Sequence, residues 1–162
     1  GRNAKPFIKN NQNVTGIELS KTAIEIANNH FNNVVKIYHG SVAELPFDSK
    51  KYDGIFCYAL LHLLDEKERL QCINNCYNQL QPGGYMVFVT LSINDMRYGK
   101  GIEIEENRYT TAHDVNLFFY NKFKIKQEFK DYGLLEAIEV TEPIKPIKNK
   151  PSQIFWKIVC HK

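Results

Sequence analysis

Three short stretches place polar side chains directly after apolar runs, where residues at the ends of buried strands could meet a ligand. The acid Glu18 lies at the end of the run 14–19, the turn Gly40-Ser41-Val42 follows the run 34–39, and His62 ends the run that begins at Gly54. A carboxylate at the end of such a strand can accept hydrogen bonds from both ribose hydroxyls of a nucleoside. Imidazole titrates near neutrality, so His62 could move a proton. The spacing predicts a nucleoside site with one histidine available for acid–base chemistry.

Each of these residues also has an ordinary structural explanation. Glu18 stands just before a helix start, where a negative charge favours the helix dipole. Gly40-Ser41 is typical of a simple turn, and His62 of a helix-start histidine packed under a loop. A ribose-binding acid is shared by methyl donors and nicotinamide cofactors alike. Glu18 alone therefore indicates a nucleoside rather than a particular reaction.

The residues between these stretches predict alternating strands and helices. We expect strands at 14–19, 34–39, 52–58 and 85–91, with helices at 21–30 and 66–80. Ser20 is a good N-cap for the first helix. Later residues predict a helix at 112–119 and two strands, 123–129 and 153–160, that pair as an antiparallel hairpin at the sheet edge. The expected fold is α/β, a doubly wound Rossmann-like sheet that is mostly parallel.

Composition places the chain among ordinary globular domains. Its 162 residues, 43% hydrophobic and 24% charged, suit one domain with a real core. The net charge of +3 is too small to favour nucleic acid or a membrane surface, so we expect neither as a partner. The four cysteines lack CxxC spacing, and no metal site is expected. A cytoplasmic protein with reduced thiols is the prediction.

A short joint connects the polar helix 66–80 to the apolar run Met86-Val87-Phe88-Val89. It reads Leu80-Gln81-Pro82-Gly83-Gly84-Tyr85. Proline cannot continue a helix and glycine accepts positive φ, so the sequence turns sharply here into a strand. With the upstream run 54–62 this makes a βαβ unit. Its joint closely resembles the one between the fourth and fifth strands of class I S-adenosylmethionine-dependent methyltransferases.

The resemblance extends over nearly the whole chain and is closest to small-molecule methyltransferases of the tellurite-resistance and general methyltransferase-domain type. It implies S-adenosylmethionine as the cofactor, with the first residues forming the end of a glycine-rich loop near its methionine part. Ser41 stands where the family often carries an aspartate that contacts adenine. The residues that the resemblance assigns to the cofactor are Gly1, Arg2, Glu18, Leu19, Gly40, Ser41, Val42, Cys57 and Tyr58.

The resemblance also implies where the methyl acceptor would lie. Tyr98 and Glu103 belong to the loop after strand 85–91, where a substrate lid would be found, although a flexible surface connection explains the same residues. The segment from Tyr58 to His62 would face the substrate. A thiolate acceptor needs no general base, whereas a hydroxyl or ammonium acceptor would need one, with His62 or Glu103 as the candidates.

The resemblance also implies the domain boundaries and the activity. The family's first strand and earlier glycines do not precede Gly1, so we expect residues 1–162 to form a single class I methyltransferase domain truncated at its N-terminus. The predicted activity is methyl transfer to a small-molecule acceptor by in-line displacement. Two alternatives remain open: a non-catalytic module of this fold that binds a protein or RNA, and a nicotinamide-dependent dehydrogenase. The Pro-Gly-Gly joint and the edge hairpin argue against the dehydrogenase.

Overall fold

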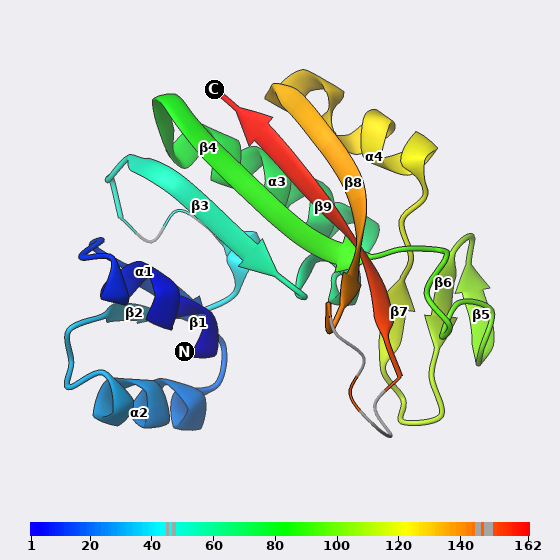
Figure 1. The fold of residues 1–162 in the computed structure, drawn as a ribbon, viewed down its shortest axis with the longest axis horizontal. Coiled ribbons are helices and arrows are strands. Elements are labelled where there is room, and N and C mark those ends of the chain that lie inside the picture. Colours follow the sequence, from blue (N-terminus) through cyan, green and yellow to red (C-terminus); the bar gives the residue numbers. More distant parts are fainter. Residues whose placement is uncertain (45, 47, 145–146, 148–150) are drawn as a thin grey trace. The chain divides into compact units, whose positions relative to one another are not determined.

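A computed structural model describes residues 1–44, 46, 48–144, 147 and 151–162. These residues form two compact units, Gly1–Ser49 and Lys50–Lys162. Figure 1 draws both as ribbons. The single-domain interpretation of the sequence stays a prediction.

The first unit is a small parallel sheet with helices around it. Its elements are α1 (Lys5–Lys9), β1 (Thr15–Glu18), α2 (Lys21–His30) and β2 (Lys36–His39). The two strands run parallel, with Glu18 opposite His39. Helix α2 has the predicted bounds because the Ser20 hydroxyl accepts a hydrogen bond of 3.2 Å from the Ala23 amide. The parallel pair brings the ends of both strands to one edge.

The second unit is built on a four-stranded sheet in the order β3-β4-β9-β8. The strands are β3 (Tyr52–Tyr58), β4 (Leu80–Leu91), β8 (Leu134–Glu142) and β9 (Gln153–His161). Strands β3 and β4 are parallel and are joined by α3 (Glu66–Gln79), whereas β9 runs antiparallel to both of its neighbours. The predicted α/β class, with parallel pairs and a closing antiparallel hairpin, is confirmed.

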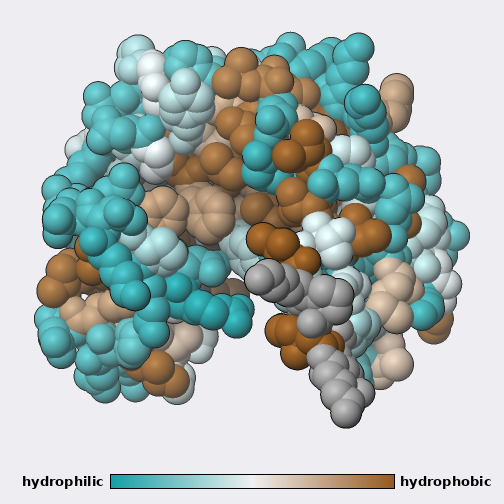
Figure 2. All heavy atoms as spheres, viewed as in Figure 1, coloured by the Kyte–Doolittle hydropathy of each residue, from teal (hydrophilic) through white to brown (hydrophobic). Residues whose placement is uncertain are grey.

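Helices pack on one face of this sheet, whereas apolar side chains are exposed on the other. Alternate residues Met86 and Phe88 of β4 are fully buried, and the Phe88 ring lies 5.3 Å from that of Phe129 in α4 (Lys122–Phe129). On the opposite face Tyr85 is 48% exposed and Phe56 is 43% exposed. Helix α3 lies behind the strands in Figure 1, and Figure 2 shows hydrophobic side chains gathered over the strands on the viewer's side. Within this unit, one sheet face is therefore apolar and open.

A second, antiparallel sheet follows β4 in the chain. It consists of β5 (Ile102–Glu105), β6 (Arg108–Thr110) and β7 (Asn116–Phe118) in that order. Tyr109 and Leu117 of this sheet pack in one buried cluster with Val89, Leu91 and Phe155 of the main sheet. The region expected to be a loop and lid is thus an ordered sheet anchored on the main core.

Two predicted elements are wrong. Residues 123–129 form helix α4 rather than a strand, because Asn121 caps the segment by accepting from the Lys124 amide at 2.7 Å, and Ile125 and Phe129 are buried one helical turn apart. The hairpin partner of β9 is therefore β8. Residues 112–119 contain a turn and β7 instead of a helix, since Asp114 adopts a positive φ of 56° and turns the chain back onto β6.

The Pro-Gly-Gly joint is shorter than predicted. Strand β4 already begins at Leu80, which pairs with Tyr52, and the ladder is irregular before it resumes at Tyr85 opposite Gly54. Gly83 has a φ of 81°, and its amide donates to the Lys162 carbonyl at 2.7 Å. The joint is an irregular start of the strand, held against the end of the chain, rather than a free turn.

Candidate functional site

Glu18 lies at the carboxyl end of β1, as the sequence predicts. It is half-buried, and its Oε1 accepts a hydrogen bond of 2.9 Å from the Ser20 amide. The neighbouring Leu19 is 68% exposed, and its carbonyl lies 3.0 Å from Nε2 of His39. A carboxylate has acceptor capacity on both oxygens, so the bond to Ser20 orients the group while leaving capacity for ribose hydroxyls. The arrangement fits a nucleoside at this strand end.

The turn after β2 lies beside Glu18. The Gly40 amide donates to the Glu18 carbonyl at 3.1 Å, so the two predicted cofactor stretches are brought together. Ser41 uses its hydroxyl to accept from the Ala43 amide at 3.2 Å, and its own amide donates to Glu44 at 3.3 Å. The hydroxyl proton of Ser41 can still donate to an adenine nitrogen. Val42 begins the short helical turn Val42–Glu44.

Gly1 and Arg2 are exposed at the start of the first unit. A Cβ on Gly1 would meet the edge of the Phe31 ring, so a larger residue there would require that ring to move. The cavity of about 90 Å³ that Gly1 and Gly16 help to line is much smaller than a typical ligand pocket of about 300 Å³ or more. Glu18 lines the same cavity.

Cys57 and Tyr58, at the carboxyl end of β3, point in different directions. The Cys57 thiol is hydrogen-bonded to Cys72 of α3, and Cys72 in turn to Cys76. The bond to Cys72 and burial raise the pKa of the Cys57 thiol well above its ordinary value. The Tyr58 hydroxyl instead donates to the carboxylate of Glu142, at the end of β8. Cys57 is held against the helix, while Tyr58 lies on the open face.

A hollow of about 450 Å³ lies on the open face near the end of β8. Its lining consists of Val89, Val140, Thr141, Glu142, Ile144 and Lys157. The volume falls in the range of small-molecule pockets. Sequence reasoning gave Glu142 no role, and no local pattern could have done so, because its partner Tyr58 is 84 residues away in the chain.

His62 is buried rather than open to solvent. It is 6% exposed, with its Nδ1 3.5 Å from the Thr90 hydroxyl oxygen and its ring centroid 6.4 Å from that of Phe155. Burial, and secondarily the charge of Arg97, lower the pKa of His62 to about 4. The ring is therefore neutral at physiological pH and a weak base. A catalytic role for His62 stays a prediction.

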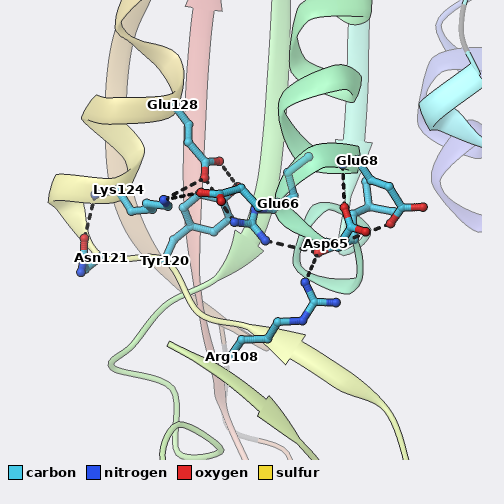
Figure 3. A network of polar contacts seen from close by, with 10 residues as sticks. Asp65, Glu66, Glu68, Arg108, Tyr120, Asn121, Lys124 and Glu128 are labelled. Carbon is cyan, nitrogen blue, oxygen red and sulfur yellow. Dashed lines mark hydrogen bonds and ion pairs between the residues drawn. The ribbon is translucent and has the colours of Figure 1, made fainter. Parts of the chain in front are cut away.

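The segment carrying His62 is fixed by two buried arginines. Both donate to the Leu64 carbonyl, Arg69 at 3.3 Å and Arg108 at 3.1 Å. Figure 3 shows Arg108 reaching from β6 toward this segment, and Glu128 beside Lys124 and Tyr120. Glu128 accepts from Arg69 at 3.3 Å and from Tyr120 at 2.6 Å. The network ties the residues after β3 to the small sheet and to α4.

Tyr98 and Glu103, the predicted acceptor residues, meet through Tyr109. The Tyr98 ring lies edge-on to Tyr109 at 5.4 Å, and the Tyr109 hydroxyl donates to Glu103 at 3.2 Å. Tyr98 itself donates to Asn107 at 2.8 Å. Their hydroxyl and carboxylate groups are thus engaged in contacts within the small sheet and the loop before it.

In the part of the chain that the structure describes, no three histidine, cysteine, aspartate or glutamate side chains gather into a group that could hold a metal ion. None of the helices among those residues is long and apolar enough to cross a membrane.

Comparison with known families decides the class. A family model described as "Methyltransferase domain" matches residues 1–88, more than half of the 162-residue chain. The chain belongs to the methyltransferase domain family. The predicted resemblance to S-adenosylmethionine-dependent methyltransferases is confirmed, and with it the cofactor class.

Two curated relatives of this methyltransferase domain are methyltransferases, one named for a tRNA and the other for ubiquinone biosynthesis. A tRNA N(3)-methylcytidine methyltransferase of Drosophila melanogaster is 25% identical over 57% of this chain and 30% of its own length. A ubiquinone biosynthesis O-methyltransferase of Coxiella burnetii is 30% identical over 52% of this chain and 37% of its own length. The matched segment thus spans about a third of the length of these relatives.

A solved structure has the same fold over the whole chain. The 1,6-didemethyltoxoflavin-N1-methyltransferase of Burkholderia thailandensis, solved with S-adenosylhomocysteine, matches with a TM-score of 0.75. It is 14% identical, and the match covers 100% of this chain and 66% of that one. At this identity the likeness establishes the class I methyltransferase fold alone.

Proposed function

We propose that this methyltransferase domain transfers a methyl group from S-adenosylmethionine to a small-molecule acceptor. The observation that carries the proposal is the family match, together with an acid at the end of β1 and an apolar hollow lined by Val89 of β4 and by residues of β8 and β9. Ligands of open α/β sheets bind outside the carboxyl ends of parallel strands. Glu18 ends β1, and Val89 of the hollow lies near the carboxyl end of β4.

The residues of the first unit would hold the nucleoside part of the cofactor. Glu18 would accept from the ribose hydroxyls, since its carboxylate is already oriented by the Ser20 amide. Ser41 would donate to adenine through its hydroxyl. Gly1 and Arg2 would lie near the methionine part.

Methyl transfer from S-adenosylmethionine requires mainly alignment of the reactants by the protein. Bound S-adenosylmethionine supplies a methyl group that is already activated by its sulfonium. The chain's own task is to align the acceptor atom with the methyl carbon and sulfur and to keep water out. The hydrogen bonds of Arg69 and Arg108 to the Leu64 carbonyl would keep the segment after β3 rigid for that alignment.

Label transfer tests the proposal. The protein in its natural length is incubated with S-adenosylmethionine labelled on the methyl group, together with amines, phenols and thiols, or separately with total RNA. Label in the small-molecule fraction, reduced in Glu18→Ala, is the expected result. Label only in RNA or protein would overturn the small-molecule acceptor. Absence of any transfer, combined with binding of a nicotinamide dinucleotide, would instead favour the dehydrogenase alternative.

A further inference from the structure

The hollow over the open face of the main sheet combines an apolar wall with two charged side chains. Val89, Val140 and Ile144 form the wall, and Glu142 and Lys157 are the charged groups. Val89 belongs to a buried cluster that includes Phe155, and Val140 and Tyr58 pack against this cluster. A ligand of matching size would bury mostly apolar surface here, which is the main source of small-molecule affinity.

The two charged groups are not equivalent. Lys157 forms an ion pair of 2.6 Å with Glu136, so its charge is compensated. None of the ion pairs among residues 1–44, 46, 48–144, 147 and 151–162 includes Glu142. The Glu142 carboxylate accepts from the neutral Tyr58 hydroxyl, which orients it without cancelling its charge. Among the residues that the structure describes, Glu142 is thus a negative charge of the hollow without an ion-pair partner.

We propose that this hollow is the acceptor pocket and that it takes an apolar amine, with Glu142 binding the ammonium group and removing its proton. The inference rests on the proposed methyl transfer and names the acceptor class for it. An amine is selected because a carboxylate attracts a cation, whereas an anionic acceptor would meet charge repulsion in a partly buried site.

The proposed methyl transfer to an amine moves one proton and two electron pairs. The acceptor ammonium gives one proton to Glu142 and becomes a neutral amine with a lone pair. That pair forms the new nitrogen–carbon bond to the methyl group, while the carbon–sulfur electron pair goes to sulfur. The methylated nitrogen then carries the positive charge that the sulfonium loses, and the nearby Glu142 site releases its proton to solvent afterwards.

Tyr58 has a positioning role in this arrangement. It is the residue after Cys57 at the end of β3, the strand end that the family resemblance assigns to the cofactor, and its hydroxyl contacts Glu142. Tyr58 thus connects the predicted donor side of the site to the hollow. Of the two bases expected from the sequence, His62 is buried and Glu103 accepts a hydrogen bond from Tyr109.

A binding measurement tests the acceptor class without relying on turnover. Ligand-observed NMR compares 2-phenylethylamine with 3-phenylpropionate, two probes of similar size and opposite charge, on the natural-length protein. We expect the amine to bind more tightly than the acid. Glu142→Gln should weaken amine binding by about tenfold, the scale of a charged hydrogen bond. Glu105→Gln, on exposed β5 outside the hollow, is the matched control and should change nothing.

A second variant guards against misfolding of the first. Ile144 is 90% exposed, so Ile144→Lys cannot disturb the core, yet it places a positive charge at the hollow and should also weaken amine binding. Equal binding of acid and amine, no amine binding, or unchanged binding in both variants would overturn the inference. Label transfer is measured separately, so the acceptor class can fail this test while the proposed methyl transfer still holds.

Discussion

The Tyr58 hydroxyl donates a hydrogen bond to the carboxylate of Glu142, joining two residues that are 84 positions apart in the chain. The contact links the carboxyl end of β3 to the end of β8 across the open sheet face. It places an acid beside a small apolar hollow in a methyltransferase domain. The acid–base group of the proposed acceptor site thus comes from the closing hairpin rather than from the segment after β3.

Glu18 should control affinity for the nucleoside. Replacing it with alanine removes the carboxylate from the end of β1, and we expect S-adenosylmethionine affinity to fall by about tenfold or more, as for a lost charged hydrogen bond. Calorimetry with the natural-length protein measures this. The exposed Glu25 of α2 provides the control, since Glu25→Ala removes an acid of the same unit away from the strand end. Equal affinities in both variants would remove Glu18 from the site.

The buried pair Arg69–Glu128 should be the most costly ion pair to break. The two side chains are 1% and 2% exposed, so Glu128→Gln leaves the Arg69 charge without its carboxylate in the core. We expect a loss of about 3–5 kcal/mol in the free energy of unfolding. Denaturant titration measures it.

The pair Lys124–Glu66 is the matched control. Glu66 is 57% exposed, and Glu66→Gln should cost at most about 1 kcal/mol. Similar small losses in both variants would show that the Arg69 network does not hold the segment after β3 in place.

His62 should make stability depend on pH. Its ordinary pKa is 6.5 and burial lowers the folded value to about 4, so the unfolded chain binds more protons between these values. The free energy of unfolding should therefore fall as pH drops through this window, by about 3 kcal/mol from this residue. Other groups titrate too, and the comparison with His62→Phe, which cannot take up a proton, isolates the share due to His62.

The slope of stability against pH is the quantity to compare. His62→Phe should flatten the decline between pH 6.5 and 4, whereas His113→Gln, at an exposed turn, should leave it as in the parent protein. An unchanged slope in His62→Phe would mean that the imidazole is reached by solvent and protonates in the folded state.

Gly133 should be intolerant of any side chain. It adopts a φ of 64° just before β8, and an added Cβ would lie 1.9 Å from the His161 carbonyl oxygen. Gly99 has a similar φ of 72° but open space around it. Gly99→Ala should cost about 1–2 kcal/mol from backbone strain alone, and Gly133→Ala clearly more, because the β8–β9 hairpin must move. Thermal unfolding compares them, and equal losses would contradict the close packing of the hairpin.

The early elements could be predicted because their signals are local. Ser20 caps α2 through its own hydroxyl, and the apolar run of β3 has the predicted bounds. The end of α3 is likewise marked by the Pro-Gly-Gly joint. Glu18 is the last residue of β1 and Gly40 directly follows β2, so parallel pairing alone brings them together.

The later elements depend on contacts that the local pattern does not contain. Residues 123–129 alternate apolar and polar side chains at their start, but burial of Ile125 and Phe129 one helical turn apart selects the helix. The partner of Glu142 is Tyr58, far away in the chain. His62 follows an apolar run like a site residue, and only tertiary packing buries it.

The central claim is that this methyltransferase domain binds S-adenosylmethionine at the end of β1. Calorimetric titration of the natural-length protein with S-adenosylhomocysteine tests it most directly. We expect saturable binding at one site, weakened in Glu18→Ala and intact in Glu25→Ala, with no comparable heat from NADH. Absence of S-adenosylhomocysteine binding, or equally tight binding of NADH, would contradict it.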